Sequence, residues 1–366
     1  MIIGLNLLYL LPNTVGGTET YARGLIQGLS GVASKYQFIL FLNRESSDLF
    51  QSLNSRFKRI ICPVSAVRRH ERYLYEQLLL PKLAKQNGVS VIHSLGYTTP
   101  LRASCPTVVT IHDLNFRAFG KEMPLTRRLA LEFFVGMGVR SAQKIITVSE
   151  FSKQQIMTAY RLDEQRIAVI HEAPLLDHEL DKSAAAEQIK ERPSPPLPRP
   201  YFVAFTSASP HKNISRLIDA YALLRAKRCI QHSFVLIGHT PSDLALSRDV
   251  YATGYVSRAS MLELLRGADF LVFPSYYEGF GLPILEAMAC GVPVACSRIA
   301  SLPEVAGEAA IYFDPFSVEE IARAVEQLTN DRGLRSRLRE EGFRNVQRFS
   351  WVETARKTLA AYGEIL

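Results

Sequence analysis

Short, strongly apolar runs recur along the whole chain, and each is separated from the next by a stretch with helical spacing. The runs are residues 89–93, 107–112, 144–149, 166–171, 201–207, 233–238, 269–275, 292–297 and 309–313. Apolar runs without polar alternation are typical of parallel strands that are covered on both faces. The pattern therefore predicts an α/β protein built from doubly wound parallel sheets.

The length of the chain and a proline-rich segment predict two domains. At 366 residues with 47% apolar content, the chain exceeds what one hydrophobic core usually serves. Five prolines fall within residues 181–200 and preclude regular structure there. We therefore predict a first domain over 1–182, a linker over 183–200 and a second domain over 201–366, whose last helix packs back on the first. The two domains are expected to face each other across a cleft.

Several classes of protein are disfavoured by what the sequence lacks. Its five cysteines form no Cys-x-x-Cys pair, so neither a disulfide framework nor a zinc site is indicated. The apolar opening at residues 1–13 contains Asn6, has no basic residues before it and is followed by no small-residue cleavage motif, which favours a buried strand over a signal peptide. No other apolar run approaches the ~18 residues of a membrane span. We expect a cytoplasmic protein in a reducing compartment.

Positive charge is concentrated in the first half of the chain. Residues 1–182 contain 22 Lys and Arg against 15 Asp and Glu, whereas residues 183–366 contain 21 against 20. A basic region of this kind fits nucleic acid or an anionic membrane. No RNA-binding motif or zinc finger accompanies it, so we expect no nucleic-acid partner.

The densest basic segment, residues 56–85, has two interpretations. It interleaves tyrosines and leucines with cations, which suits peripheral contact with an anionic membrane; it also suits a solvated helix face whose apolar side packs on its own domain. Its cations are Arg56, Lys58, Arg59, Arg68, Arg69, Arg72, Lys82 and Lys85, and its anions are Glu71 and Glu76.

Ligands of doubly wound proteins bind beyond the carboxyl ends of the strands, and the predicted strands here end in polar residues. A plain alternative is that strand ends are polar because turns are.

No dinucleotide fingerprint follows the first strand, where only Gly16-Gly17 stands, and no phosphate-binding P-loop is present. The Asp-x-Asp pair by which many sugar transferases hold manganese is also absent, so we expect no metal and no cofactor.

The stretch 273–291 places two carboxylates around a tight turn. A buried strand precedes Glu278, the turn Gly279-Phe280-Gly281 follows, and a helix with Pro283 in its first turn then contains Glu286. Backbone N–H groups at such a helix start bind anions. A sugar nucleotide needs donors for its pyrophosphate and acceptors for its ribose and sugar hydroxyls, and this stretch offers both. An alternative for Glu286 alone is a favourable interaction with the helix dipole, because an acid near a helix start is stabilised there. That role does not account for Glu278.

The segment 254–315 resembles the donor-binding region of retaining glycosyltransferases of family four, which have the GT-B fold of two Rossmann-like domains. The resemblance extends to Gly16–Glu19, Thr110–Phe116, Thr147–Lys153 and Pro210–Tyr221, so it spans nearly the whole chain. It implies a hexosyltransferase that takes its sugar from a nucleotide diphosphate sugar. The product would be a polysaccharide or a lipid-linked glycan, and the donor GDP-mannose rather than UDP-glucose.

The resemblance also implies roles for individual residues. Glu286 would bind the ribose, Glu278 would lie near the sugar 3-hydroxyl, and Lys212 would neutralise the pyrophosphate. His112 would face the reacting sugar and orient it; a structural alternative is that His112 merely caps its strand. The remaining donor contacts would come from Gly16, Gly17, Thr206, Tyr255, Val256, Gly279, Phe280, Gly281 and Leu282.

Two stretches depart from the family pattern. Many relatives carry Gly-Arg after the first strand of the second domain, whereas this chain has Thr206 and His211 there, with Arg216 as a further candidate to assist Lys212. The usual Asn-Gly after the last strand of the first domain is replaced by residues 171–173, His-Glu-Ala, which alter the acceptor side or form another turn. Two other functions stay open, a sugar phosphorylase that uses inorganic phosphate and a catalytically silent partner protein.

Overall fold

The computed structural model describes residues 1–12, 16–120, 123–176, 197–207, 209–239 and 246–366. The chain divides into two compact units, one of Met1–Ser183 with Ser350–Leu366 and the other of Ala184–Phe349. Most of the linker predicted for 183–200 lies outside the described residues, which resume at 197. The second unit ends at Phe349, because the last helix belongs to the first unit.

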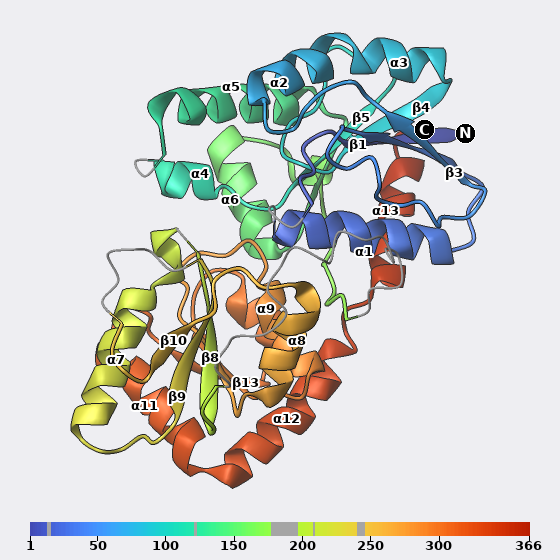
Figure 1. The fold of residues 1–366 in the computed structure, drawn as a ribbon. Coiled ribbons are helices and arrows are strands. Elements are labelled where there is room, and N and C mark those ends of the chain that lie inside the picture. The colour runs from blue at the N-terminus through green and yellow to red at the C-terminus, as the bar shows by residue number, and fades with distance from the viewer. Residues whose placement is uncertain (13–15, 121–122, 177–196, 208, 240–245) are drawn as a thin grey trace. The chain divides into compact units, whose positions relative to one another are not determined.

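The first unit is built on a seven-stranded parallel sheet in the order β3-β2-β1-β4-β5-β6-β7. Its strands are β1 (Ile2–Leu7), β2 (Gln37–Leu42), β3 (Phe57–Ile61), β4 (Val89–Ser94), β5 (Thr107–Ile111), β6 (Lys144–Thr147) and β7 (Ile167–Val169). Its helices are α1 (Gly17–Gly31), α2 (Arg69–Leu78), α3 (Leu80–Gln86), α4 (Asn115–Ala118), α5 (Leu125–Ser141), α6 (Glu150–Tyr160) and α13 (Trp351–Gly363). Helices α2, α3 and α5 lie on one side of the sheet, and α1 and α13 on the other (Figure 1).

Helix α13 is held to the first unit by close backbone packing and a buried hydrogen bond. A Cβ atom placed on Gly28 of α1 would lie only 2.1 Å from the carbonyl oxygen of Trp351, so the two helices approach at a distance that requires glycine. Nδ1 of His93 on β4 lies 2.6 Å from the Tyr362 hydroxyl, and both side chains are buried. The end of the chain is thereby part of the first core.

The second unit is built on a six-stranded parallel sheet in the order β10-β9-β8-β11-β12-β13. Its strands are β8 (Tyr201–Thr206), β9 (Ser233–Gly238), β10 (Val250–Ala252), β11 (Leu271–Phe273), β12 (Val294–Ser297) and β13 (Ala310–Phe313). Its helices are α7 (Ile214–Ala226), α8 (Arg258–Gly267), α9 (Leu282–Ala289), α10 (Leu302–Ala306), α11 (Val318–Asn330) and α12 (Arg332–Val346). Stacked rings of Phe202, Phe234 and Phe270, with centroids 4.6 and 5.2 Å apart, lie in its core.

The predicted class, two doubly wound parallel sheets, is confirmed, and the structure adds strands that the apolar runs did not reveal. Strand β3 lies at the edge of the first sheet and exposes Lys58 and Arg59, so it has no continuous apolar run. Strand β10 has only three residues. Strand β2 is as apolar as its neighbours and is not among the predicted runs. Among the described residues, no helix has the length and apolarity needed to cross a membrane.

Candidate active site

Strands β8 and β11 form the switch point of the second sheet. The chain leaves β8 toward β9 on one side and returns to β11 on the other, and ligands of doubly wound sheets bind beyond the carboxyl ends of such a strand pair. Lys212 closes the short 3-10 turn that follows β8, and Glu278 follows β11. Lys212 Nζ lies 2.6 Å from Glu278 Oε1, and the two side chains are 18% and 14% exposed. Two residues predicted for separate roles therefore form one ion pair.

The turn after Glu278 has a constrained conformation that leaves its backbone available for ligand contacts. Gly281, the N-cap of α9, has φ 113°, a conformation that side chains rarely adopt, and a Cβ there would lie 2.9 Å from Leu302 Cδ2. The Ser301 hydroxyl lies 2.9 Å from the carbonyl oxygen of Glu278 and 2.7 Å from that of Phe280. The Phe280 side chain is buried, edge-on to Phe349. Only the backbone of this turn can therefore serve a ligand at the start of α9.

Glu286 projects from α9 and is paired with a residue that the sequence did not single out. Its carboxylate is buried, and Oε1 lies 2.6 Å from Nη2 of Arg258 at the start of α8. The Arg258 side chain is 20% exposed. A buried carboxylate is costly unless it is paired, and Arg258 supplies the partner of Glu286 at this position.

The other donor residues predicted in the second unit lie in different settings. Thr206 is buried, and its hydroxyl donates to the carbonyl oxygen of His239 at 3.0 Å. Tyr255 is 69% exposed and stacks on His239, with centroids 6.1 Å apart. Val256 lies half-buried beside Tyr255. An exposed aromatic ring of this kind can contact a nucleotide base.

His211 and Arg216 do not supply the missing cation in a simple way. Burial lowers the pKa of His211 to about 4, against the opposing effect of Glu278, so this imidazole is neutral at pH 7. Arg216 donates to Asn213 Oδ1 at 2.9 Å and lies over the Phe316 ring. Lys212 is thus the cation placed directly at the switch point.

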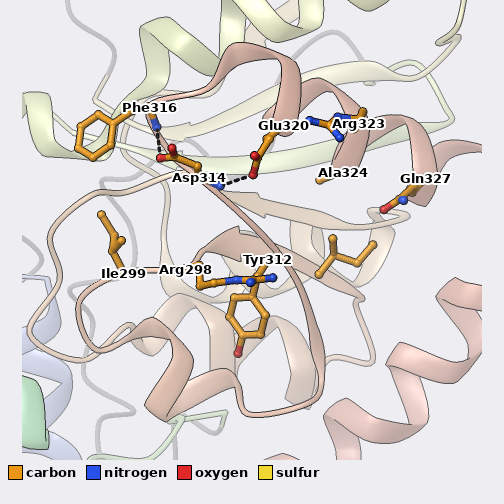
Figure 2. Close-up of a pocket in the computed structure, with 10 residues that line it drawn as sticks. Arg298, Ile299, Tyr312, Asp314, Phe316, Glu320, Arg323, Ala324 and Gln327 are labelled. Carbon is orange, nitrogen blue, oxygen red and sulfur yellow. Dashed lines mark hydrogen bonds between the residues drawn. The ribbon is translucent and has the colours of Figure 1, made fainter.

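A hollow of about 690 Å³ lies elsewhere in the second unit, between the edge strand β13 and α11 (Figure 2). None of the predicted donor residues lines it. Two of its carboxylates accept backbone hydrogen bonds at the start of α11, Asp314 from Phe316 N and Glu320 from Asp314 N, each at 2.9 Å. These acids have a structural role, and the hollow is not the predicted site.

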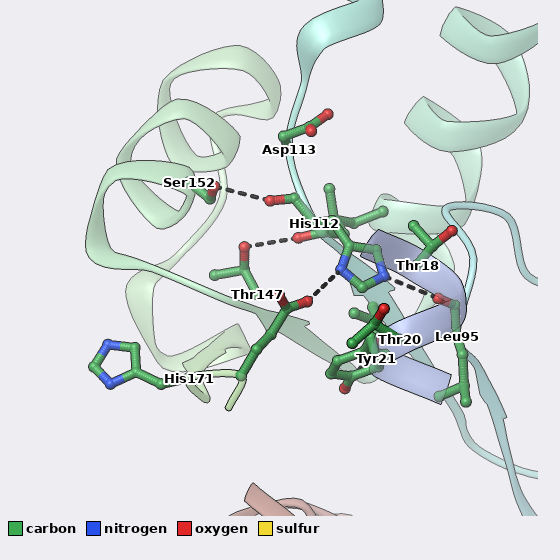
Figure 3. A network of polar contacts seen from close by, with 12 residues as sticks. Thr18, Thr20, Tyr21, Leu95, His112, Asp113, Thr147, Ser152 and His171 are labelled. Atoms are coloured by element: carbon green, nitrogen blue, oxygen red, sulfur yellow. Dashed lines mark hydrogen bonds and ion pairs between the residues drawn. The ribbon is translucent and has the colours of Figure 1, made fainter. Parts of the chain in front are cut away.

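In the first unit, the predicted residues follow β1 and β5. Gly16 caps α1, which begins at Gly17, just beyond residues 13–15 that lie outside the described chain. His112 follows β5 and is buried, with Nδ1 3.1 Å from Glu172 Oε1 and Nε2 3.2 Å from the carbonyl oxygen of Leu95 (Figure 3). Glu172 belongs to the departure from the usual Asn-Gly, and its buried carboxylate is in hydrogen-bond contact with His112.

The structure therefore brings Lys212, Glu278 and the turn before α9 together within one unit. It adds partners that single-sequence reasoning missed. Arg258 follows the helix-capping Ser257 and could have been noticed as a cation near the predicted base contact; nothing in the pattern linked it to Glu286. Ser301 lies in the segment 254–315 that carries the family resemblance, but the sequence analysis predicted no role for it.

Comparison with protein families covers both units. The family described as "Glycosyltransferase Family 4" matches residues 15–173, and "Glycosyl transferases group 1" matches residues 186–345. The chain is 30% identical over 291 residues to O-antigen chain mannosyltransferase B of Escherichia coli, covering 74% of each chain. It is 33% identical over 285 residues to MMP alpha-(1->4)-mannosyltransferase of Mycolicibacterium hassiacum, covering 71% of this chain and 66% of the relative.

Solved structures with the same fold cover the chain from end to end. Sucrose-phosphate synthase from Thermosynechococcus elongatus superposes with a TM-score of 0.73 at 18% identity, covering 100% of this chain and 98% of the other. Anabaena Alr3699/HepE, solved in complex with UDP and glucose, gives 0.70 at 18% identity with full coverage of both chains. At these identities the likeness establishes the fold. Together with the family matches and the relative at 30% identity, it shows that the chain belongs to the family-four glycosyltransferases of GT-B fold.

Proposed function

We propose that the protein is a retaining hexosyltransferase that moves a sugar from a nucleotide diphosphate sugar to a glycan or a lipid-linked sugar in polysaccharide synthesis. One observation carries the proposal. Glu278 and Glu286 flank the constrained turn at the carboxyl end of β11, and Lys212 lies 2.6 Å from Glu278 at the switch point. This arrangement offers a cation and backbone donors for a diphosphate beside acceptors for hydroxyl groups.

The proposed contacts follow from the groups present. The amides around Phe280 and Leu282 would meet the diphosphate at the start of α9, where the helix dipole favours an anion. Glu286 would accept from the ribose hydroxyls and Glu278 from a sugar hydroxyl. In the first unit, Gly16-Gly17 would approach the donor phosphate, and His112 would orient the reacting sugar.

Departure of the diphosphate would be assisted without a metal. Negative charge builds on the leaving group as the glycosyl bond breaks, and fixed donors aimed at that charge are a large catalytic term. The Lys212 ammonium has three N–H donors, so it can hold Glu278 and still bind phosphate oxygens. We propose that Lys212 and the turn amides share this work.

The names of relatives favour a mannose donor. Two relatives at 30–33% identity are called mannosyltransferases, one of them of the O-antigen chain. HepE has been solved with UDP-glucose. We therefore expect GDP-mannose to be preferred over UDP-glucose, with an acceptor of the polysaccharide class.

The decisive experiment incubates the protein with GDP-mannose or UDP-glucose and an O-antigen-type acceptor, and determines the anomeric configuration of the product by NMR. Transfer with the donor configuration kept supports the proposal, whereas inversion would overturn the retaining mechanism. Formation of sugar 1-phosphate from glycan and inorganic phosphate would support the phosphorylase. Absence of nucleotide binding, donor hydrolysis and transfer would favour the silent partner.

We also propose that the first unit, acting in the cytoplasm, contacts an anionic membrane through a surface formed by α2 and α5. Four apolar residues spaced four apart along α5 are 41–65% exposed: Leu125, Leu129, Phe133 and Met137. On α2, Leu74 and Leu78 are 60% and 59% exposed. The ring of Tyr73 stacks on Phe134 at 4.8 Å and joins the two helices. Part of the apolar side of the basic segment packs on its own domain, since Leu80 is buried and Tyr75 and Leu83 pack against the same core, whereas Leu74 and Leu78 stay exposed.

Cations lie beside these apolar residues. Arg69 on α2 and Arg127 on α5 are close enough that burial, and then the charge of Arg69, lower the pKa of Arg127. Three cations counted in the basic segment instead bond within the fold. Arg56 precedes β3 and donates to the carbonyl oxygen of Ser30, whereas Lys58 and Arg59 lie on β3 and donate to Asn87 and Ser47. The anion Glu76 is buried. Arg69 and Arg72 on α2 and Arg127 on α5 thus lie on the helices that expose the apolar side chains, an arrangement complementary to an anionic lipid surface.

Vesicle sedimentation tests this contact. We expect the protein to sediment with anionic vesicles at low salt, to bind neutral vesicles weakly and to be released as salt rises. Leu129→Glu with Phe133→Glu should abolish binding, whereas Phe343→Glu on α12, an equally drastic change at a 42% exposed site, should not. Recovery of the wild-type protein in the supernatant with anionic vesicles at low salt would refute the membrane contact and leave the transferase proposal untouched.

A further inference from the structure

The imidazole of His112 has a partner on each ring nitrogen, and the two partners differ in kind. Nε2 faces the carbonyl oxygen of Leu95 at 3.2 Å, and Nδ1 faces Oε1 of Glu172 at 3.1 Å (Figure 3). The His112 and Glu172 side chains are only 8% and 4% exposed. The backbone at His112 is also held, because its carbonyl oxygen accepts from the Ser152 hydroxyl at 2.9 Å.

A proton count follows from these contacts. A carbonyl oxygen only accepts hydrogen bonds, so Nε2 must carry a hydrogen. A neutral ring would then turn the lone pair of Nδ1 toward a carboxylate, which also only accepts. One further proton must therefore lie between Nδ1 and Glu172. Imidazole is the stronger base of the two by about two pKa units in water, and the Leu95 carbonyl oxygen, which accepts from Nε2, also favours the charged ring here. We therefore assign the proton to the ring.

We propose that Glu172 holds His112 as an imidazolium at neutral pH, so that His112 acts as a cationic hydrogen-bond donor and Glu172 as its positioning residue. The charge state stands on the geometry of the first unit alone. Its catalytic consequence rests on the proposed transferase function.

The titratable rings around this pair are neutral, and the nearby carboxylates of Glu19 and Asp113 have partners of their own, Glu19 with Arg23 at 2.8 Å. The Tyr21 ring lies edge-on to His112 at 4.8 Å, and burial raises the pKa of Tyr21 and of Tyr9, so both phenols are neutral. Burial, with a further contribution from His112, lowers the pKa of His93 to about 3, so His93 is neutral as well. Asp113, next to His112, accepts from the Tyr97 hydroxyl and from the Asn115 amide, each at 3.0 Å.

A doubly protonated ring restricts the chemistry that is available. With hydrogens on both nitrogens, His112 has no lone pair with which to remove a proton or to attack a sugar carbon. It can donate through Nε2 to a substrate oxygen that takes the place of the Leu95 carbonyl, and hydrogen bonds from a charged donor are roughly twice as strong as neutral ones. His112 would therefore orient the sugar by donation only.

Nitrogen-15 NMR of histidine-labelled protein at pH 7.5 tests the charge state directly. The His112 signals are assigned by their loss in His112→Gln, among the 8 histidines of the chain. We expect both nitrogens of His112 to show imidazolium shifts. In Glu172→Gln the amide can donate to Nδ1, so the ring should become neutral with its hydrogen on Nε2. Glu150→Gln, which changes an exposed carboxylate on α6, should leave His112 charged.

A neutral His112 in the wild-type protein at pH 7.5 would overturn the proposal, and so would an imidazolium that persists in Glu172→Gln. If Glu172→Gln does not fold, the wild-type spectrum still decides. Where transfer is measurable, Glu172→Gln should lower kcat at least tenfold and leave the Kd of the nucleoside diphosphate unchanged, whereas an unchanged kcat would refute the catalytic consequence. A protein that binds no nucleotide would refute the transferase proposal, while the NMR result would still decide the charge of His112.

Discussion

Arg258 is predicted to affect nucleotide binding without touching the nucleotide, because its guanidinium holds the carboxylate of Glu286 at 2.6 Å. If Glu286 accepts from the ribose hydroxyls, Glu286→Ala should cost about 1.5–3 kcal/mol, the range for a hydrogen bond to a charged group. That corresponds to roughly a 10- to 150-fold rise in Kd. Arg258→Ala leaves the buried Glu286 carboxylate unpaired and free to turn away. We expect it to lose part of the same free energy, about 1 kcal/mol, or roughly fivefold in Kd.

The double variant separates this indirect effect from a direct one. If Arg258 works only through Glu286, then adding Arg258→Ala to Glu286→Ala should cause no further loss, and the coupling free energy should equal the whole effect of Arg258→Ala. Arg266→Ala, which removes an exposed arginine from the same helix, is the matched control and should not change Kd.

Isothermal titration calorimetry with GDP and UDP, and with their 2′,3′-dideoxy analogues, gives the readout. The losses should appear with the ribonucleotides and nearly vanish with the dideoxy analogues, which lack the hydroxyls that Glu286 would bind. Equal weakening of both nucleotide types by Arg258→Ala would mean that Arg258 supports the fold or contacts the phosphates. An unchanged Kd for Glu286→Ala would mean that Glu286 does not bind the ribose and instead only interacts with the dipole of α9.

Three further predictions concern metal, packing and pH. Transfer should survive EDTA, because Lys212 and the turn amides are proposed to carry the leaving-group charge; loss of activity that manganese restores would contradict that account. Gly28→Ala should lower the free energy of unfolding of the first unit by about 1–3 kcal/mol through overlap with the Trp351 backbone, whereas Gly31→Ala, with open space around it, should be nearly neutral in thermal unfolding. Since burial lowers the pKa of His93 from 6.5 to about 3, the unfolded chain binds a proton that the folded unit does not, and stability should fall as pH drops below about 6.5. His93→Gln should remove roughly 3 kcal/mol of that loss between pH 7 and 4.5, so an unchanged pH dependence of its melting temperature would show that His93 is not responsible.

The fold was predictable for those elements whose burial makes their local sequence recognisably apolar. Central parallel strands are covered on both faces and must be apolar throughout, so runs such as 107–112 and 201–207 stand out. Edge strands escape this rule, and β3 with its exposed Lys58 and Arg59 shows no such run. Helix α9 was also predictable, because Pro283 and Gly291 mark its ends and the structure places it at Leu282–Ala289.

The site was predictable only in part, because its partners are far apart in sequence. Glu278 and Glu286 lie eight positions apart around one turn, whereas Arg258 lies 28 residues from Glu286, and Glu172 lies 60 residues from His112. Such pairs depend on which strands are neighbours in the sheet, and the hydrophobic periodicity of a single segment does not predict strand order. The exposed stripe on α5 was missed for a similar reason: its apolar residues have the spacing of a core-facing helix, and only the structure shows that this side is uncovered.

Each acidic residue in these sites is compensated by a base within its own unit: Glu278 by Lys212, Glu286 by Arg258 and Glu172 by His112. Removing one member of such a pair does more than delete a contact, since it leaves the other as a buried charge without its partner. Glu278→Ala should release Lys212 toward the diphosphate, and we expect it to tighten nucleotide binding while slowing transfer. Alanine at Lys212 would weaken binding twice over, by losing the cation and by leaving the Glu278 carboxylate to repel the phosphates. The roles of Glu278 and Lys212 therefore require Glu278→Gln, which removes the charge and keeps the shape, and the double variant Glu278→Ala with Lys212→Ala. The comparison separates the loss of the Glu278 charge from the effect of a Lys212 side chain that is no longer held.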